Sequence, residues 1–150
     1  MGVQLAIYKE RLYPSVSFSI ALALSGPMVL LASLPFGTGL AIALGLMVPL
    51  GLNLVVQLLA PKITVANGRL VADRISVPIS ALGKSSELSK EEFTKALGPK
   101  ADPRAQLMIR GYVPGGVKIE VADPEDPTPY LLISSRNPKK LAIALDANRP

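Results

Sequence analysis

The densest group of carboxylates in the sequence, Asp123, Glu125 and Asp126, is the first place to look for metal or acid–base chemistry. A calcium loop places oxygen ligands at alternating positions, uses a Gly for its sharp turn and ends on a bidentate Glu. Segment 122–129 has no Gly and contains three prolines. Because proline restricts the unfolded chain and cannot donate to a sheet, we interpret this segment as a rigid, charged loop without a metal.

Nucleophilic catalysis has little support in the composition. The sequence contains neither Cys nor His, which removes thiol nucleophiles, imidazole acid–base catalysis and the usual zinc ligands. The candidate hydroxyl nucleophiles are two pairs of serines, Ser85 with Ser86 and Ser134 with Ser135. Lys84 precedes Ser85, but neighbours along a strand point to opposite faces. No phosphate-binding Gly motif occurs either, so we expect no enzymatic activity and no cofactor.

Binding is the chemistry that remains, because basic residues outnumber acidic ones by 16 to 11. The charges are scattered without aromatic platforms, which argues against nucleic acid and favours an anionic membrane surface or an acidic partner. The candidate residues for this face are Arg110, Lys118, Arg136, Lys139 and Lys140. Arg110 and Lys118 flank a predicted turn at 114–116, which would place them on the exposed face of one hairpin. Lys139 and Lys140 fall in the first turn of a predicted helix, where the helix dipole disfavours cations; a solvated helix start is the favoured explanation, and binding of an anionic lipid or acidic partner is the alternative.

The stretch from Leu12 to Pro61 contains no Asp, Glu, Lys or Arg. About 20 apolar residues cross the hydrocarbon of a bilayer as a helix, which satisfies every backbone hydrogen bond internally. Turn residues at 35–39 divide the stretch into predicted spans at 15–34 and 40–60. A cleaved signal peptide is the competing interpretation of the first span, but that segment is too long and a second follows at once. We therefore predict a transmembrane helical hairpin at 15–60.

The flanks of the two spans predict their orientation. Lys9 and Arg11 precede the first span, Lys62 follows the second, and the connecting turn carries no charge. Basic residues near the ends of spans stay on the cytoplasmic side. The sequence thus predicts a multi-pass protein of the cell membrane, with two spans and both termini in the cytoplasm.

One row of the second span is small or polar at every fourth position: Ala41, Gly45, Pro49, Asn53 and Gln57. Small residues let helices approach closely, and amide side chains can hydrogen-bond across the contact. We predict that this row faces protein, either the first span through Ser17, Ala21 and Ser25 or another integral membrane protein. Pro27 and Pro49 are expected to kink their helices.

Segment 61–150 has the pattern of a small α+β domain with mainly antiparallel strands. Asn67-Gly68 predicts a tight hairpin, Pro78 an edge strand, and 117–121 and 130–134 two further strands. Ser89 and Glu92 form a capping box that predicts a helix at 90–97, burying Phe93, Ala96 and Leu97. Asn137 and Pro138 start a last helix, which packs back through Leu141, Ala144 and Leu145.

A curled antiparallel sheet closed by a C-terminal helix is the layout of a pleckstrin-homology-like split barrel, which we predict for 61–150 in the cytoplasm. Residues 1–14 are predicted to be a cytoplasmic tether. The alternation of Val3, Leu5 and Ile7 also fits an interfacial segment or a strand added to the later domain. A fold alone supplies no function.

Three groups of residues carry a family resemblance: Tyr8–Leu12; Ala96–Pro99 with Ala101–Ala105; and Val121–Tyr130 followed by Ser134–Arg136. Together they resemble a family of short actinobacterial two-helix membrane proteins of unknown function, the domain of unknown function 3093. The run Asp123–Tyr130 is the most specific part. The resemblance implies two transmembrane helices and a cytoplasmic domain, and it supplies no activity and no catalytic residue. The first span departs from the family in lacking tryptophans near its membrane boundary.

Two functions fit these features. The first is a non-catalytic, membrane-anchored interaction module at the inner face of the cell membrane, whose β domain binds a protein or lipid headgroups. The alternative is an accessory or assembly subunit of a larger membrane complex, which docks through its second transmembrane helix.

Overall fold

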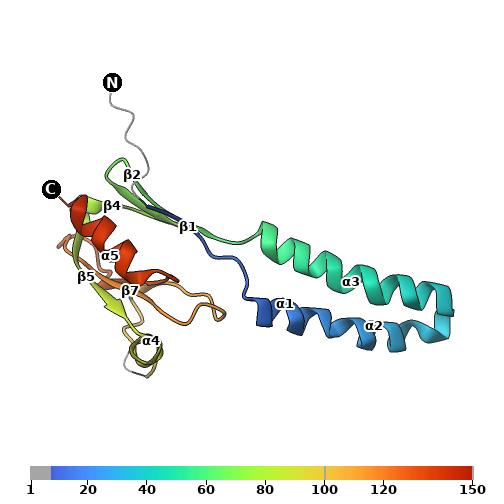
Figure 1. The fold of residues 1–150 in the computed structure, drawn as a ribbon. Coiled ribbons are helices and arrows are strands. Elements are labelled where there is room, and N and C mark those ends of the chain that lie inside the picture. Colours follow the sequence, from blue (N-terminus) through green and yellow to red (C-terminus); the bar gives the residue numbers. More distant parts are fainter. Residues whose placement is uncertain (1–7, 100, 150) are drawn as a thin grey trace. The chain divides into compact units, whose positions relative to one another are not determined.

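The computed structural model describes residues 8–99 and 101–149. The chain divides into two compact units: a helical unit, Tyr13–Ala60, and a β unit made from the residues on either side of it (Figure 1). The predicted alternation at Val3, Leu5 and Ile7 lies outside the described residues.

The helical unit is a hairpin. Its elements are α1 (Val16–Ala23), α2 (Ser25–Ser33), the 3-10 turn η1 (Leu34–Phe36) and α3 (Thr38–Leu58). Segments 16–36 and 38–58 have 21 residues each and are long and apolar enough to cross a membrane. Ser15 caps α1, since its Oγ accepts a hydrogen bond from the N–H of Phe18 at 3.2 Å.

Proline affects the two arms of the hairpin differently. Pro27 has no N–H for the carbonyl of Ala23, and the first arm is interrupted at Leu24, between α1 and α2. The Oγ of Ser25 donates to the carbonyl oxygen of Leu22 at 2.6 Å beside this interruption. Helix α3, in contrast, continues through Pro49.

The arms pack through glycine. Gly26 is buried on α2, and a Cβ added there would lie 2.7 Å from the carbonyl oxygen of Gly45 on α3. That carbonyl is the one that Pro49, four residues later, cannot bond, so it is free to point at the backbone of α2. Asn53 adds a polar link, because its Nδ2 donates to the carbonyl oxygen of Ser19 at 3.3 Å.

The β unit begins with an antiparallel sheet that incorporates the residues before the hairpin. In spatial order its strands are β1 (Tyr8–Arg11), β2 (Lys62–Ala66), β3 (Arg69–Ala72) and β4 (Ile75–Pro78). The last residues of the segment predicted to be a tether, Tyr8–Arg11, therefore form a strand of the β unit. The predicted Asn67-Gly68 turn is present, with φ angles of 52° and 68°. Pro78 ends an edge strand, as predicted.

The second sheet contains, in spatial order, β5 (Leu82–Leu88), β7 (Gly116–Val121), β8 (Tyr130–Ser134) and β6 (Gln106–Met108). Its pairs are antiparallel except β6 with β8, which is parallel. The prediction that 106–110 and 117–121 form one hairpin is wrong. Strand β8 is apolar and buried along Leu131–Ser134, so it occupies the interior of the sheet with β7 on one side and β6 on the other.

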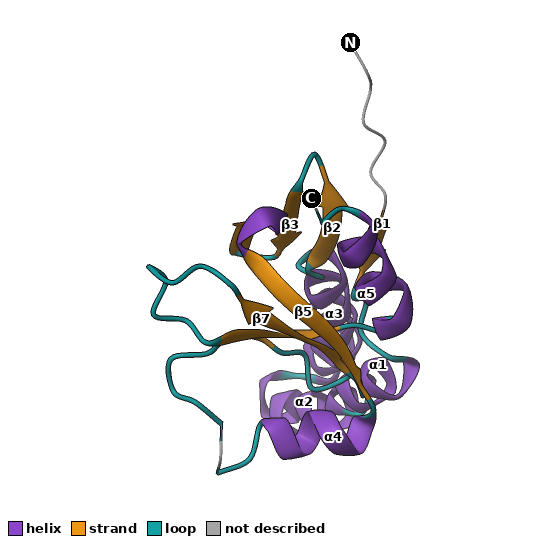
Figure 2. Cartoon of the chain, turned by 90° about the vertical axis from the view of Figure 1, so that its left-hand side faces the viewer, coloured by secondary structure: helices purple, strands orange, loops and turns teal. Residues whose placement is uncertain are grey.

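Two helices complete the β unit (Figure 2). Helix α4 (Lys90–Ala96) begins with the predicted capping box and buries Phe93, whereas Ala96 and Leu97 are only half-buried. Helix α5 (Pro138–Ala147) packs against β5, β7 and β1 through Leu141, Ala144 and Leu145. Asn137 precedes α5 but makes no side-chain capping bond. The 3-10 turn η2 (Ile79–Ala81) leads from one sheet to the other, and both sheets contribute to one apolar core.

We expect Gly26→Ala to destabilise the helical hairpin by about 1–3 kcal/mol, because the new methyl group overlaps the carbonyl of Gly45. The matched control is Gly51→Ala, where a Cβ meets nothing within 4 Å. Thermal loss of the helical circular dichroism signal of the full chain, in a mild detergent, measures the effect. Equal melting temperatures for the two variants would contradict the packing described.

Candidate functional site

The five basic residues predicted to form one anion-binding face lie in three places. Arg110 pairs with Asp73, with Nη2 and Oδ2 3.3 Å apart. The Nζ of Lys118 lies 4.4 Å from the ring centre of Tyr130, which is cation–π geometry. The exposed start of α5 carries the remaining three: Arg136, Lys139 and Lys140. The prediction that Arg110 and Lys118 share a hairpin is wrong, because β7 pairs with β5 and β8 instead.

A different group of basic residues surrounds the point where the chain leaves the first sheet and returns to it. There the N–H of Leu12 donates to the carbonyl oxygen of Pro61 at 3.0 Å, and Arg11 is paired with Lys62. The N–H of Asp73 donates to the carbonyl oxygen of Lys62 at 3.1 Å, so the turn after β3 lies at the same end of the sheet. We call the basic residues at this end the basic rim: Arg11, Lys62, Arg74 and Arg110, the last of which pairs with Asp73.

Sequence patterns alone do not reveal the basic rim, since its members come from four separate segments. Lys62 and Arg74 are exposed, and Arg11 and Arg110 are half-buried. Strand register is the signal that could have revealed the basic rim. Once β1 is aligned with β2 and β2 with β3, Arg11, Lys62 and the turn that holds Arg74 lie at the same end of the sheet.

Two of the three carboxylates in segment 122–129 accept hydrogen bonds from the backbone of their own loop. The Oδ1 of Asp126 accepts from the N–H of Thr128 at 2.8 Å, and the Oδ1 of Asp123 accepts from the N–H of Glu125 at 3.0 Å. The hydrogen bond from Thr128 lowers the pKa of Asp126. Together these contacts fit the predicted rigid, charged loop.

A buried carboxylate is the centre of the polar interior. Glu10 on β1 is 9% exposed and accepts three hydrogen bonds: from the Tyr8 hydroxyl at 2.7 Å, from Ser135 Oγ at 2.6 Å and from the N–H of Arg136 at 2.8 Å. Ser135 Oγ in turn accepts from the N–H of Asn137 at 3.1 Å. Burial raises the pKa of Tyr8 to about 12, and the hydrogen bond to Glu10 adds to the rise.

Two serines that the sequence offers as nucleophiles belong to this interior. Ser135 is 1% exposed and donates to Glu10, and Ser134 is fully buried, its Oγ accepting from the N–H of Arg110 at 3.0 Å. A hydroxyl that is buried and already bonded has no access to a substrate. The Ser135–Glu10 pair is therefore structural, although it has the composition of an acid–nucleophile pair.

The contacts above join stretches that are distant in sequence. Tyr8–Leu12 meets Ser134–Arg136 through Glu10. The stretch after α4 meets β8 where the N–H of Asp102 donates to the Tyr130 hydroxyl at 3.1 Å. Asp102 also holds Arg104 with two side-chain hydrogen bonds, which lower the pKa of Asp102. These are the stretches that carry the family resemblance.

Comparison with known proteins supports that resemblance. A family model described as a protein of unknown function (DUF3093) matches residues 7–145. The chain belongs to the DUF3093 family. No curated protein and no solved structure matches it.

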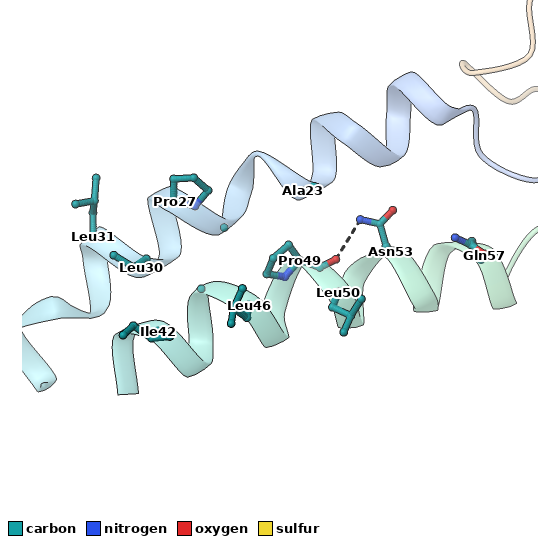
Figure 3. Close-up of a pocket in the computed structure, with 12 residues that line it drawn as sticks. Ala23, Pro27, Leu30, Leu31, Ile42, Leu46, Pro49, Leu50, Asn53 and Gln57 are labelled. Carbon is teal, nitrogen blue, oxygen red and sulfur yellow. Dashed lines mark hydrogen bonds between the residues drawn. The ribbon is translucent and has the colours of Figure 1, made fainter. Parts of the chain in front are cut away.

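The helical hairpin of this DUF3093 protein uses most of its small-and-polar row internally. Ala41, Gly45 and Pro49 are buried, and Asn53 also donates to the carbonyl oxygen of Pro49 at 3.1 Å (Figure 3). Gln57 is exposed. Beside this contact lies an open groove of about 780 Å³, lined mainly by apolar side chains with Asn53 and Gln57 towards the end of α3.

The predicted partner row on the first arm, Ser17, Ala21 and Ser25, is wrong. Ser17 and Ala21 are exposed, while Gly26 and Ser33 are the buried small residues of that arm. The interruption at Leu24 changes the face that α2 presents, so a regular four-residue repeat drawn across it selects the wrong residues. Ser33 keeps its hydroxyl bonded within α2, donating to the carbonyl oxygen of Val29 at 2.5 Å.

We expect Glu10→Gln to weaken the attachment of β1 by about 2–3 kcal/mol. An amide offers one acceptor oxygen where the carboxylate accepts three hydrogen bonds, and it turns an N–H₂ group toward donors. Backbone hydrogen exchange of Tyr8–Arg11 in the full-length DUF3093 chain, in detergent micelles, measures this opening. Lys9→Gln, at an exposed position of the same strand, is the control and should exchange like the unmodified chain.

The tyrosine titration of this DUF3093 protein should contain one group near pH 12 that Tyr8→Phe removes. Because the folded pKa of Tyr8 is above its ordinary value, the stabilisation from the neutral phenol is complete below pH 10. It is lost as pH rises from 10 through 12. Difference absorbance of the tyrosinate between the full chain and Tyr8→Phe gives this pKa directly. A difference curve centred at pH 10 would show that the Tyr8 phenol is not held as described.

Proposed function

We propose that this DUF3093 protein is a non-catalytic, membrane-anchored interaction module, which holds its β unit at the inner face of the cell membrane. The observation that carries the proposal is the pairing of β1 with β2. The residues that lead into the helical hairpin and those that leave it are hydrogen-bonded neighbours, joined by Leu12 and Pro61 at 3.0 Å. The β unit is thus attached to its anchor at two points.

The surface of the hairpin supports a membrane location. A core helix of a soluble protein is mostly buried, whereas the apolar windows of the two arms are only 11% and 17% buried. Side chains such as Leu46 and Leu50 are 67% and 68% exposed. Exposing so many large apolar side chains to water is unfavourable, and lipid is the environment that removes the cost.

Charge supports the orientation. Lys9, Arg11 and Lys62 flank the hairpin at its open end, and the turn around Gly37 carries no charge. The positive-inside rule then gives two spans, with both termini and the β unit in the cytoplasm.

The fold of the β unit supports binding rather than chemistry. Two four-stranded sheets share one core and α5 packs against it, which supports our proposal of a pleckstrin-homology-like split barrel for the β unit. The parallel β6–β8 pair and the strand supplied from before the hairpin are additions to that layout. Ser135 donates to Glu10 and Ser134 accepts from the N–H of Arg110, so the surface charges are the groups that we propose for a partner.

The alternative, an accessory or assembly subunit of a membrane complex, is favoured by the groove beside Gln57. It is the weaker proposal because the row from Ala41 to Asn53 already packs against the first arm. A stoichiometric integral membrane partner after mild detergent extraction would favour it over the first.

The absence of Cys in the chain permits a clean topology experiment. Gly39→Cys lies at the start of α3, next to the turn, where a Cβ meets nothing within 4 Å, and Ser86→Cys lies on an exposed position of β5. With a membrane-impermeant maleimide on intact cells, we expect labelling at residue 39 only, and labelling at residue 86 after the membrane is permeabilised. Labelling of residue 86 in intact cells would overturn the inner-face location.

A further inference from the structure

Among the residues that the structure describes, the basic rim holds more basic than acidic side chains. Four basic residues meet there, and the acid among them is Asp73, which pairs with Arg110. Glu10 lies next to Arg11 in sequence, but its carboxylate is directed inward to Ser135 and Arg136. Lys62 and Arg74 extend from this edge as exposed side chains.

Three acidic residues of the described β unit, Asp123, Glu125 and Asp126, lie together in a loop away from the basic rim. The loop that contains Asp123 borders Pro78 and Ala81, where the N–H of Ala122 donates to the carbonyl oxygen of Ala81 at 2.8 Å. Pro78 is paired with Arg69, at the opposite end of β4 from Asp73. The acidic loop therefore lies beside the end of the first sheet that is opposite the basic rim, an end that also carries Arg69.

We propose that the basic rim binds the headgroups of anionic phospholipids in the leaflet that the β unit faces. This inference rests on the proposed function, and it names the partner and the residues that contact it. The face differs from the one predicted from sequence, because Lys118, Lys139 and Lys140 are not part of the rim.

Chain connectivity selects lipid over a soluble acidic partner. Only Tyr13 and Pro14 separate Leu12 from Ser15, which caps α1, and only Leu59 and Ala60 separate Leu58 from Pro61. An extended residue spans about 3.5 Å, so each link reaches on the order of 10 Å. If the arms of the hairpin cross the bilayer, their ends lie near the headgroups, and the basic rim lies within one short link of them.

Native mass spectrometry of the full chain in detergent micelles tests the inference. The chain is titrated with phosphatidylglycerol and, separately, with phosphatidylcholine of the same acyl chains. The rim variant combines Lys62→Gln with Arg74→Gln; the matched control combines Lys139→Gln with Lys140→Gln, which removes the same charge from exposed positions of α5.

We expect the unmodified chain to bind phosphatidylglycerol more tightly than phosphatidylcholine. A basic residue near an anionic surface is worth roughly fivefold in affinity, so the rim variant should lose about 25-fold for phosphatidylglycerol alone. The α5 variant should stay within about twofold of the unmodified chain. Unchanged phosphatidylglycerol affinity in the rim variant, or an equal loss in both variants, would overturn the inference.

Cysteine labelling at residues 39 and 86, repeated in the rim variant, separates this inference from the proposed function. If labelling is as expected but the rim variant keeps its phosphatidylglycerol affinity, lipid binding by the basic rim is refuted and the proposed function stands. Labelling of residue 86 from outside intact cells refutes the inner-face location, and the lipid inference fails with it.

Discussion

The pairing of β1 with β2 is the constraint on which the rest of this structure depends. It makes the helical hairpin an insertion between two neighbouring strands of one sheet, with Leu12 and Pro61 hydrogen-bonded where the insertion begins and ends. The conformational entropy lost when a loop is closed rises only slowly with loop length. An antiparallel helical hairpin also brings its own two ends close together. The contact of Gly26 with Gly45 therefore contributes to the same closure as the strand pairing.

Glu10 explains why β1 pairs in this register. Burying a carboxylate is costly unless it is fully bonded, and Glu10 receives three donors, two of them from the junction of β8 and α5. Because side chains alternate across a strand, a slip of one residue would put Lys9 or Arg11 in place of Glu10, opposite donors that a cation cannot satisfy. The network thus specifies the register of a strand only four residues long.

Local signals predicted local structure well. The Asn67-Gly68 turn, the capping box at Ser89 and the packed face of α5 all depend on residues within one or two turns of each other, and all are present. Choosing neighbours in a sheet requires information that periodicity does not contain. The alternation at 117–121 predicted a strand but gave no means of knowing that its partners are β5 and β8. The role of Glu10 was not predicted, because nothing near it in sequence shows that it will contact Ser135. The predicted row Ser17, Ala21 and Ser25 was wrong because the first arm is interrupted beside Pro27.

The positions of the basic residues in the fold also depend on long-range contacts that the sequence does not reveal. A net charge of +5 favours an anionic partner without saying where that partner would sit. The fold pairs Arg110 with Asp73 and Arg104 with Asp102, and it places Lys118 over the ring of Tyr130, whereas Lys62 and Arg74 of the basic rim are exposed. Strand register brings Arg11, Lys62 and the turn that holds Arg74 to one end of the first sheet, so the basic rim could be located only once the pairing of the strands was known.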